Sequence, residues 1–344
     1  VDALGVNCST GPDRMIEIVE KMRAFTHLPI LVQPNKGLPK MCCGQISYSL
    51  NDSDFAFWTE KIVEAGATIV GGCCGTTPQT IRSISHLKQT KTKSYKPISD
   101  TYICSATRLL KLEKGILCGE RLNPTGKKQL QKALLENNFD FLQQEALQQA
   151  AAQADFLDVN VGIPNCDEKT LIVEAVKKIQ EVCELPLQLD SANPAAIEAA
   201  IRIYNGVPMI NSVNGNEESM QALFPVIAKY GAVSVALTLD KNGIPETPEG
   251  RLEIAKKIIA KAAEYGIGKH LLVFDALVMT ISSNQQHGRI TLETLAQLKK
   301  LGVLTIIGLS NISFGLPQRA YLNRTFLIMA LQSGLDIAIM NPND

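Results

Sequence analysis

Three cysteines stand at the ends of two apolar runs, in positions that favour chemistry over packing. Cys73 and Cys74 lie in the glycine-rich segment 71–78, directly after a run that predicts a buried strand. Cys8 follows a similar run near the amino terminus. Three thiolates brought together from separate strand ends form an open zinc site, whose fourth position is left for a substrate. The pattern therefore predicts a zinc site that activates a thiol substrate.

A second set of polar side chains follows the predicted strands of the later part of the chain: Asp158, Asn160, Asp190, Asn193, Asn214, Asp275 and Asn311. Any one of them alone would indicate a capped turn, because Asn and Asp favour turns. Repetition at so many strand ends indicates a binding site instead. Carboxylates accept hydrogen bonds, and amides both donate and accept them, so the set suits a planar heterocycle rich in N–H and C=O groups. Histidine is absent from these positions, so acid–base work would fall to carboxylates, amides or water.

The elements that must position this second set alternate between short β-branched runs and longer helical patterns, which is typical of a parallel sheet with crossover helices. Eight strand candidates occur in the later part of the chain, at residues 116–118, 156–159, 187–189, 209–210, 234–237, 271–274, 304–307 and 337–339. Eight parallel βα units predict a (β/α)8 TIM barrel, in which chemistry lies at the carboxyl ends of the strands.

The earlier part of the chain shows only three βα units, with strand candidates at residues 3–6, 29–33 and 67–70. Three strands cannot close a parallel barrel, which needs eight. We therefore predict an α/β chain in which a partial βα barrel segment with the zinc site, residues 1–88, precedes the complete barrel at 106–344. A polar, basic stretch without periodicity begins near residue 88 and predicts a linker at 89–105.

Composition excludes several classes of protein. Lys and Arg total 34, as do Asp and Glu, so no overall charge favours nucleic acid or an anionic membrane. No apolar run reaches the roughly 18–20 residues of a membrane span. Nine cysteines, an odd number with two adjacent pairs, predict free thiols in a reducing, cytoplasmic setting. Val1 begins inside an apparent strand, without a signal-peptide pattern, so we expect an excised portion of a longer protein.

Together these motifs resemble the cobalamin-dependent methionine synthase family. Residues 5–8 and 71–75 are similar to the zinc-binding strand ends of its homocysteine S-methyltransferase domain. Residues 119–128, 158–162 and 308–311 are similar to its pterin-binding folate domain. The resemblance spans nearly the whole chain and keeps the family's domain order.

The resemblance implies a mechanism and assigns roles. Zinc on Cys8, Cys73 and Cys74 would bind the homocysteine sulfur, and the second barrel would hold 5-methyltetrahydrofolate. The methyl group would pass through cobalamin carried on a separate module or corrinoid protein. The family pattern makes Asn311 the group nearest N5 of the pterin and matches its remaining pterin partners to Asp158, Asn193 and Asp275, with Asn160, Asp190 and Asn214 close by. The catalytic assignments are Asn311, Asp275 and Asp158.

The sequence also departs from the family and leaves alternatives open. Roughly five strands of the homocysteine barrel are not represented, no cobalamin module follows, and Ala276 replaces a usual proline, which predicts a small loop change. Arg121 could serve a carboxylate tail or form an inter-strand salt bridge. The alternatives are a methyltetrahydrofolate:corrinoid methyltransferase with the second barrel alone, a dihydropteroate synthase and an inactive folate-binding remnant. The upstream cysteines argue against the first, and the absence of a basic Ser-x-Arg pattern near the last strand argues against the second.

Overall fold

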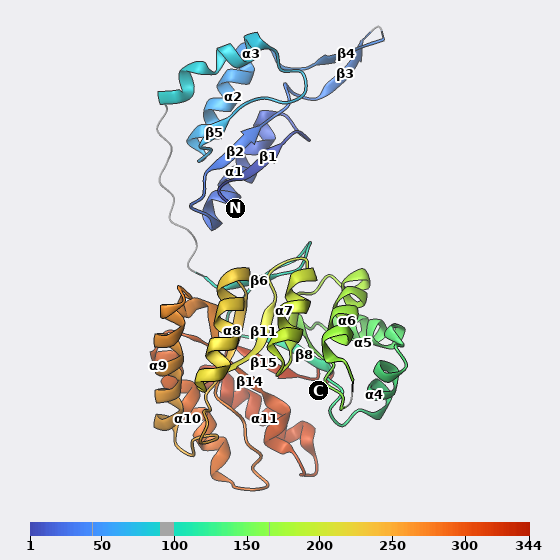
Figure 1. Cartoon of the computed structure of the whole chain (residues 1–344), viewed down its shortest axis with the longest axis vertical. Coiled ribbons are helices and arrows are strands. Elements are labelled where there is room, and N and C mark those ends of the chain that lie inside the picture. The colour runs from blue at the N-terminus through green and yellow to red at the C-terminus, as the bar shows by residue number, and fades with distance from the viewer. Residues whose placement is uncertain (43, 90–99, 165) are drawn as a thin grey trace. The chain divides into compact units, whose positions relative to one another are not determined.

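The computed structural model divides into two compact units, Val1–Ser99 and Asp100–Asp344 (Figure 1). It describes all residues except 43, 90–99 and 165. Most of the predicted linker, 89–105, therefore lies outside the described residues, whereas residues 100–105 belong to the second unit. Each unit has hydrophobic clusters of its own.

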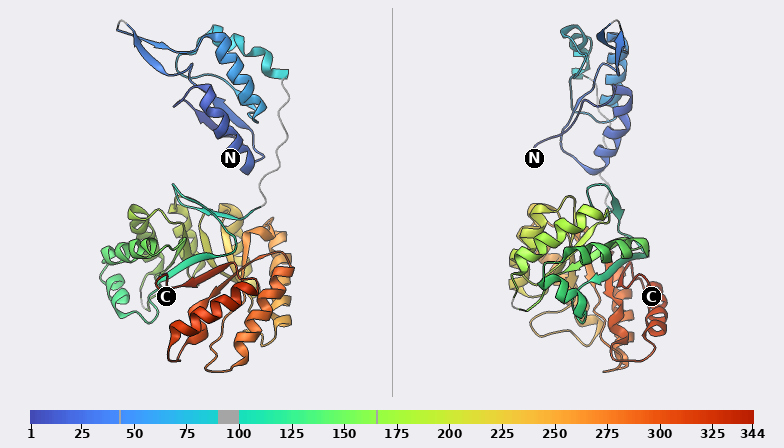
Figure 2. Two further views of the ribbon diagram at one scale, coloured as in Figure 1. Left: turned by 180° about the vertical axis from the view of Figure 1, so that it is seen from behind. Right: turned by 90° about the vertical axis from the view of Figure 1, so that its right-hand side faces the viewer.

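Eight parallel strands of the second unit close into a barrel, each bonded to the next in chain order and β15 to β8 (Figure 2). This closure confirms the predicted (β/α)8 barrel. The strands are β8 (Ile116–Leu122), β9 (Phe156–Asn160), β10 (Leu187–Asp190), β11 (Met209–Asn214), β12 (Val233–Leu237), β13 (Leu272–Asp275), β14 (Leu304–Gly308) and β15 (Ile337–Met340).

The helices of the second unit surround this barrel (Figure 2). They are α4 (Lys128–Leu135), α5 (Phe139–Ala151), α6 (Glu168–Val182), α7 (Pro194–Ile203), α8 (Glu217–Tyr230), α9 (Pro248–Glu264), α10 (Gln286–Lys300) and α11 (Arg319–Gln332). Two 3₁₀ segments, η2 (Lys269–Leu271) and η3 (Leu309–Ser313), precede β13 and follow β14. Among the described residues, we find no helix with both the length and the apolarity needed to cross a membrane.

The strand residues alternate between two cores, as a closed barrel requires. Outward side chains such as Leu157 and Val159 pack against the helices. Inward side chains such as Cys118, Phe156 and Val273 fill the barrel interior. At the carboxyl ends of the strands, the inward positions of the same alternation hold polar residues.

A hairpin of β6 (Tyr102–Cys104) and β7 (Leu109–Lys111) closes the amino-terminal end of the barrel. Its Ile103, with Leu112 just beyond, is buried in the interior cluster, and Cys104 bridges to Val207 before β11. The linker predicted at 89–105 is thus too long at its carboxyl end, because residues 100–105 are barrel residues. Their apolar side chains are too few to give a strand periodicity that sequence reasoning could detect.

The first unit contains three parallel strands in the order β1 (Leu4–Asn7), β2 (Ile30–Gln33) and β5 (Ile69–Val70). Helices α1 (Pro12–Phe25), α2 (Asp52–Glu64) and α3 (Pro78–Ser83) accompany them, followed by the 3₁₀ segment η1 (Ser85–Gln89). Met15 and Val19 of α1 bury Ile30 and Val32 of the central strand. The three βα units are those that the sequence predicts.

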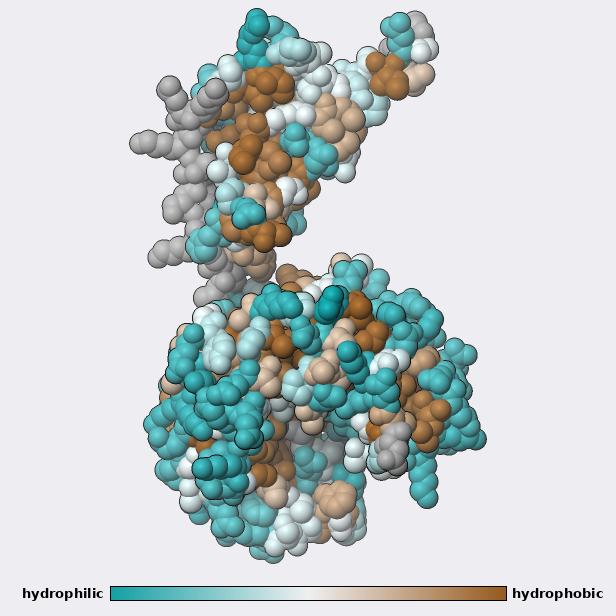
Figure 3. All heavy atoms as spheres, viewed as in Figure 1, coloured by the Kyte–Doolittle hydropathy of each residue, from teal (hydrophilic) through white to brown (hydrophobic). Residues whose placement is uncertain are grey.

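A β-hairpin that the sequence did not predict projects between β2 and α2. It pairs β3 (Pro39–Cys42) with β4 (Gln45–Tyr48) in antiparallel register. Met41 lies directly opposite Ile46, and both side chains are largely exposed. Hydrophobic colouring is visible over this hairpin in Figure 3. The hairpin matters for the site because its last residue, Tyr48, reaches the cysteine turn.

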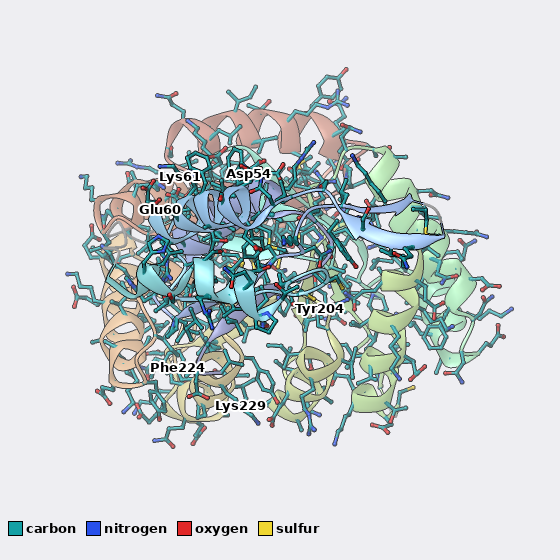
Figure 4. All side chains as sticks on the ribbon, turned by 90° about the horizontal axis from the view of Figure 1, so that it is seen from above. Asp54, Glu60, Lys61, Tyr204, Phe224 and Lys229 are labelled. Atoms are coloured by element: carbon teal, nitrogen blue, oxygen red, sulfur yellow. The ribbon has the colours of Figure 1, made fainter. Side chains whose placement is uncertain are left out.

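Tyr204, at the carboxyl end of α7, ties the closing hairpin to the barrel (Figure 4). Its buried hydroxyl donates to the Cys104 carbonyl at 3.1 Å and accepts from the Leu187 amide at 3.0 Å.

We expect Tyr204→Phe to lower the free energy of unfolding of the barrel by about 1–3 kcal/mol, because a buried amide loses its acceptor. Urea denaturation measures this change. Tyr230→Phe, whose hydroxyl meets the charged side chains of Glu198, at 3.3 Å, and Lys229, is the control and should change stability by less. Equal losses in both variants would contradict the prediction.

Candidate functional site

The structure brings Cys8, Cys73 and Cys74 together at the carboxyl ends of β1 and β5. The Sγ atoms of Cys8 and Cys74 are 3.8 Å apart, those of Cys73 and Cys74 are 3.9 Å apart, and all three lie within 4.8 Å of one another. Zn–S bonds of about 2.3 Å in a tetrahedron place sulfur atoms about 3.8 Å apart. The thiol cluster therefore fits a zinc ion with three sulfur ligands.

Backbone contacts between strand ends fix this thiol cluster. The Cys8 amide donates to the Gln33 carbonyl at 3.0 Å, and the Cys73 amide donates to the Pro34 carbonyl at 2.8 Å. The Cys74 amide donates to the side-chain oxygen of Asn35 at 3.2 Å. The segment after β2 thus holds both cysteine turns, although it supplies no sulfur itself.

The backbone at the first cysteine is strained. Cys8 and Ser9 both have φ of 62°, in the left-handed region that costs an L-residue roughly 1–2 kcal/mol. This turn directs the Cys8 sulfur toward Cys74. On the other side, a Cβ added to Gly75 would collide with the Tyr48 ring, so glycine is needed for close approach of the hairpin. Strain of this kind is retained where a site requires it.

The thiols of Cys8 and Cys73 differ in acidity. A hydrogen bond from the Ser9 amide, with further hydrogen bonds from Cys73 and Cys74, lowers the pKa of Cys8. The hydrogen bond to Cys8, followed by partial burial, raises the pKa of Cys73. Cys8 is therefore the first of these two thiols to ionise, and a thiolate is the form that binds metal.

In the second unit, Asp158, Asn160 and Asp190 meet inside the barrel mouth. Buried Asp158 accepts from the Gln188 side-chain amide at 2.7 Å, and Asp190 accepts from the Asn160 amide at 2.9 Å. Burial first, and then the neighbouring Asp190 charge, raises the pKa of Asp158 well above its ordinary value. Burial likewise raises the pKa of Asp190. This arrangement favours a ligand that presents N–H donors to both carboxyls.

Asp275 lies at the end of β13, where its carboxylate accepts from the Leu277 amide at 2.7 Å. Burial raises its pKa to about 6, against a smaller opposing effect of the Arg251 charge. Arg251 is buried and donates to the carbonyls of Ala276 and Leu277 at 2.6 and 2.8 Å. Leu277 has φ of 59°, a left-handed conformation in the turn directly after Ala276.

Asn311 lies in η3, just after β14, with an exposed side chain. That amide makes no hydrogen bond to the part of the chain that the structure describes. Its neighbour Ser310 donates to both oxygens of Glu120 at 3.0 and 3.2 Å, and Arg319 donates to the Ser310 carbonyl at 2.8 Å. These contacts hold the segment and leave the Asn311 amide available to a ligand.

Two predicted site residues cap helices or turns. Asn193 is exposed, and its side-chain oxygen accepts from the Ala195 amide at 3.0 Å as the N-cap of α7. Asn214 accepts from the Asn216 amide at 2.9 Å and lines a cavity of ≈ 420 Å³ with Asp190. Asn214 therefore stays beside the inward carboxyls, whereas Asn193 lies at the helix end, and its contact with a pterin stays a prediction.

The structure adds residues that sequence reasoning missed. Glu120, Gln188 and Ser310 all face the mouth, and burial raises the pKa of Glu120. The Gln188 side-chain oxygen is buried without a partner among the described residues. Gln188 could have been found as a polar residue at an inward position of an otherwise apolar strand. Arg121 forms a salt bridge to Glu145 at 2.7 Å, which joins β8 to helix α5 and is not the inter-strand pair that the sequence suggested.

Two protein families match successive parts of the chain. The family described as homocysteine S-methyltransferase matches residues 1–87. The family described as pterin binding enzyme matches residues 119–341, which contain every strand-end residue of the barrel mouth. The boundary between the matches falls beside the division between the two structural units.

Curated relatives match the chain over nearly its full length. The methionine synthase of Mycobacterium tuberculosis is 32% identical over 99% of the chain, and that of Mycobacterium leprae is 31% identical over 99%. The alignments cover 30% of each relative, so the chain spans about a third of their length.

Solved structures match the barrel. A dihydropteroate synthase from Xanthomonas albilineans in complex with 7,8-dihydropteroate has a TM-score of 0.54 and 21% identity, over 70% of this chain and 92% of that one. The 7,8-dihydropteroate synthase of Vibrio fischeri also has a TM-score of 0.54, with 14% identity, over 70% and 92% of the two chains. At these identities the likeness shows a shared fold alone.

We expect the raised pKa of Asp275 to make stability depend on pH. Its folded pKa of about 6 lies above the ordinary 3.8, so stability from this group is present below pH 4 and falls as the pH rises through about 6. Asp275→Asn cannot ionise and should be more stable than the natural protein by about 1–3 kcal/mol at pH 7.5, with a smaller difference at pH 5. Urea denaturation at the two pH values tests this.

The control for this comparison is Asp140→Asn, at an exposed carboxyl in the first turn of α5. It should shift stability little and equally at both pH values. A gain for Asp275→Asn that is the same at pH 5 and pH 7.5 would show that ionisation of Asp275 is not its cause.

Proposed function

Because the chain belongs to the family of pterin-binding enzymes, we propose that it is a methyltransferase segment of methionine biosynthesis, which uses 5-methyltetrahydrofolate, a corrinoid and homocysteine. The observation that carries the proposal is the presence of two different sites in one chain. One is the thiol cluster of Cys8, Cys73 and Cys74, and the other is a barrel mouth with buried carboxyls and a free amide. A pterin-binding barrel alone would have no use for the first site.

In the thiol half, the chain's role is to hold zinc and leave one position open. Zinc on the three sulfur atoms would supply a Lewis acid that keeps the homocysteine sulfur as thiolate at neutral pH. The low-pKa Cys8 and the backbone bonds to Gln33 and Pro34 preform the ligand geometry. A reducing cytoplasm would keep these thiols free, as are all seven cysteines whose side chains the structure describes.

In the folate half, the mouth residues would bind the N–H-rich edge of the pterin. Burial raises the pKa values of Asp158 and Asp190, and the Asp190 charge raises the pKa of Asp158 further. Donors from the pterin would stabilise the ionised carboxylates and replace the water that they lose. Gln188 donates to Asp158, and Asn160 donates to Asp190. These two hydrogen bonds orient the carboxyls and so fix the directions in which each can accept a further hydrogen bond. Asp275 accepts from the opposite side of the mouth.

Asn311 is the residue that we assign to N5 of the folate. Removal of a methyl group from a tertiary amine is difficult unless N5 is hydrogen-bonded or protonated as the bond breaks, and an amide N–H can donate that bond. The neighbouring Ser310, Glu120 and Arg319 fix the segment rather than the amide itself. The methyl acceptor would be cobalamin on a separate module or corrinoid protein that meets the exposed mouth.

One alternative is the half reaction alone, transfer from methyltetrahydrofolate to a corrinoid protein. The observation that favours it is the closed barrel, which has its own core and needs no strand from the first unit. Zinc binding by the full chain decides between this alternative and the complete proposal.

We expect the full chain to bind one zinc ion per molecule, and Cys73→Ser to bind far less, because loss of one thiolate leaves an incomplete ligand set. Metal analysis after dialysis measures the stoichiometry. Cys166→Ser, at a half-buried thiol of the second unit, should keep the metal. No stoichiometric zinc in the natural sequence, or full retention in Cys73→Ser, would contradict the assignment.

We expect Asn311→Ala to slow methyl transfer from 5-methyltetrahydrofolate to free cob(I)alamin by about 10²-fold or more, because the developing amine loses its hydrogen-bond donor. Folate affinity should change much less, since the pterin edge stays bound. Single-turnover absorbance of the corrinoid and folate titration give the two readouts. Asn205→Ala, at an exposed asparagine between α7 and β11, is the matched control and should leave the transfer rate unchanged. An unchanged rate in Asn311→Ala would make the N5 role wrong.

A further inference from the structure

Arg251, near the start of α9, has a fully buried side chain that none of the proposed ligand contacts uses. Its exposed fraction is 1%, and it is among the largest buried side chains that the structure describes. It forms no ion pair with any carboxylate in the described part of the chain. Arginine is almost never fully buried unless its charge is compensated, so the surroundings of this guanidinium must offset a large loss of hydration.

The Arg251 guanidinium joins two loops at the carboxyl end of the barrel. Its Nε donates to the Pro245 carbonyl, before α9, at 2.9 Å. Its Nη1 donates to the carbonyls of Ala276 and Leu277, after β13, at 2.6 and 2.8 Å. These acceptors lie on two sides of one planar group, an arrangement that a lysine ammonium cannot reproduce. Arg251 therefore fastens the turn after Asp275 to the start of α9.

This turn determines how Asp275 presents its carboxylate. The Oδ1 atom of Asp275 accepts from the Leu277 amide at 2.7 Å, so the other oxygen is the one left for a ligand. Leu277 has φ of 59°, in the left-handed region that residues with a side chain seldom adopt. The hydrogen bond from Arg251 to the Leu277 carbonyl opposes relaxation of this strained residue. The direction of the Asp275 carboxylate thus depends on Arg251.

Arg251 also acts on Asp275 through its charge. That charge opposes the effect of burial and holds the pKa of Asp275 below the value that burial alone would give. The strands that flank Asp275, β12 and β14, contain no ionisable residue. The ionisable groups of the adjoining loop and helices bond elsewhere: Asp240 after β12, Glu249 and Glu253 of α9, and His287, Arg289 and Glu293 of α10.

We propose that Arg251 is a positioning residue of the folate site, which orients the Asp275 carboxylate toward the pterin and balances its negative charge. The inference rests on the proposed function, since it needs a pterin in the mouth. Arg251 touches no ligand itself. Its hydrogen bonds to the carbonyls of Ala276 and Leu277 set the direction of the acceptor, and its charge favours the ionised carboxylate that accepts hydrogen bonds.

The test measures the affinity of the full chain for 5-methyltetrahydrofolate by calorimetry from pH 5 to pH 8. Affinity of the natural sequence should fall as the pH falls through about 6, where Asp275 takes up a proton. Arg251→Gln should bind about tenfold less tightly at pH 7, because charged hydrogen bonds are lost. Its affinity should also begin to fall at a higher pH than that of the natural sequence, since Asp275 then keeps its proton longer.

Arg251→Lys separates the two effects, because it keeps the charge and loses the planar donor group. It should bind less tightly than the natural sequence and keep the natural pH dependence. Any titration of the folate itself is the same for every variant. A role in stability alone would weaken binding without moving its pH dependence in either variant.

Thr291→Val is the matched control. Thr291 is buried in α10, and its uncharged hydroxyl also donates to the Leu277 carbonyl, at 3.1 Å. This variant should keep the natural affinity and pH dependence. An unchanged pH dependence in Arg251→Gln, or an equal shift in Thr291→Val, would overturn the inference while the proposed function stands. If Arg251→Gln does not fold, natural affinity or a shifted pH dependence in Arg251→Lys would overturn it. Binding of no folate by the natural sequence would contradict both.

Discussion

Loss of hydration at three carboxyl groups on inward positions, near the carboxyl ends of the strands of a closed barrel, is the constraint on which the second unit depends. Alternation along each strand turns Asp158, Asp190 and Asp275 toward the same enclosed space, and closure keeps water from solvating them fully. This loss of hydration raises the pKa values of all three carboxyls. N–H donors of a ligand would replace this lost hydration and stabilise the ionised carboxylates.

The first unit uses the same geometry with a different group. Parallel strands end at one edge of the sheet, and there the turns after β1 and β5 place three sulfur atoms at separations suited to a tetrahedron. The strain at Cys8 and Ser9 and the close approach of Tyr48 to Gly75 show that the surrounding backbone is shaped around these thiols. In both units the strands determine where the chemistry lies, and the turns determine which groups take part.

The sequence predicts the barrel, the three βα units and the meeting of Cys8 with Cys73 and Cys74, because strand periodicity and strand-end position are local signals. It does not predict the β3–β4 hairpin, whose last residue, Tyr48, packs against Gly75 of the cysteine turn. Nor does it separate Asn193, a helix cap, from Asn160, a partner of Asp190, since both follow strands. The sequence does not identify Glu120 and Gln188 as residues of the mouth, because that depends on which face of each strand is inward. In β8 the register also shifts near the end of the strand.

The most direct test of the account is calorimetric titration of the full chain with 5-methyltetrahydrofolate in buffers of different ionisation enthalpy. If the pterin's N–H groups bind carboxyls whose pKa values are raised by burial, binding lowers those pKa values and releases protons near pH 6, where Asp275, with its pKa of about 6, is partly protonated in the free protein. We predict one-to-one binding with a heat that changes with the buffer, in the direction of proton release. Binding without proton release, or no binding, would contradict the central claim that the buried carboxyls of the mouth recognise the folate.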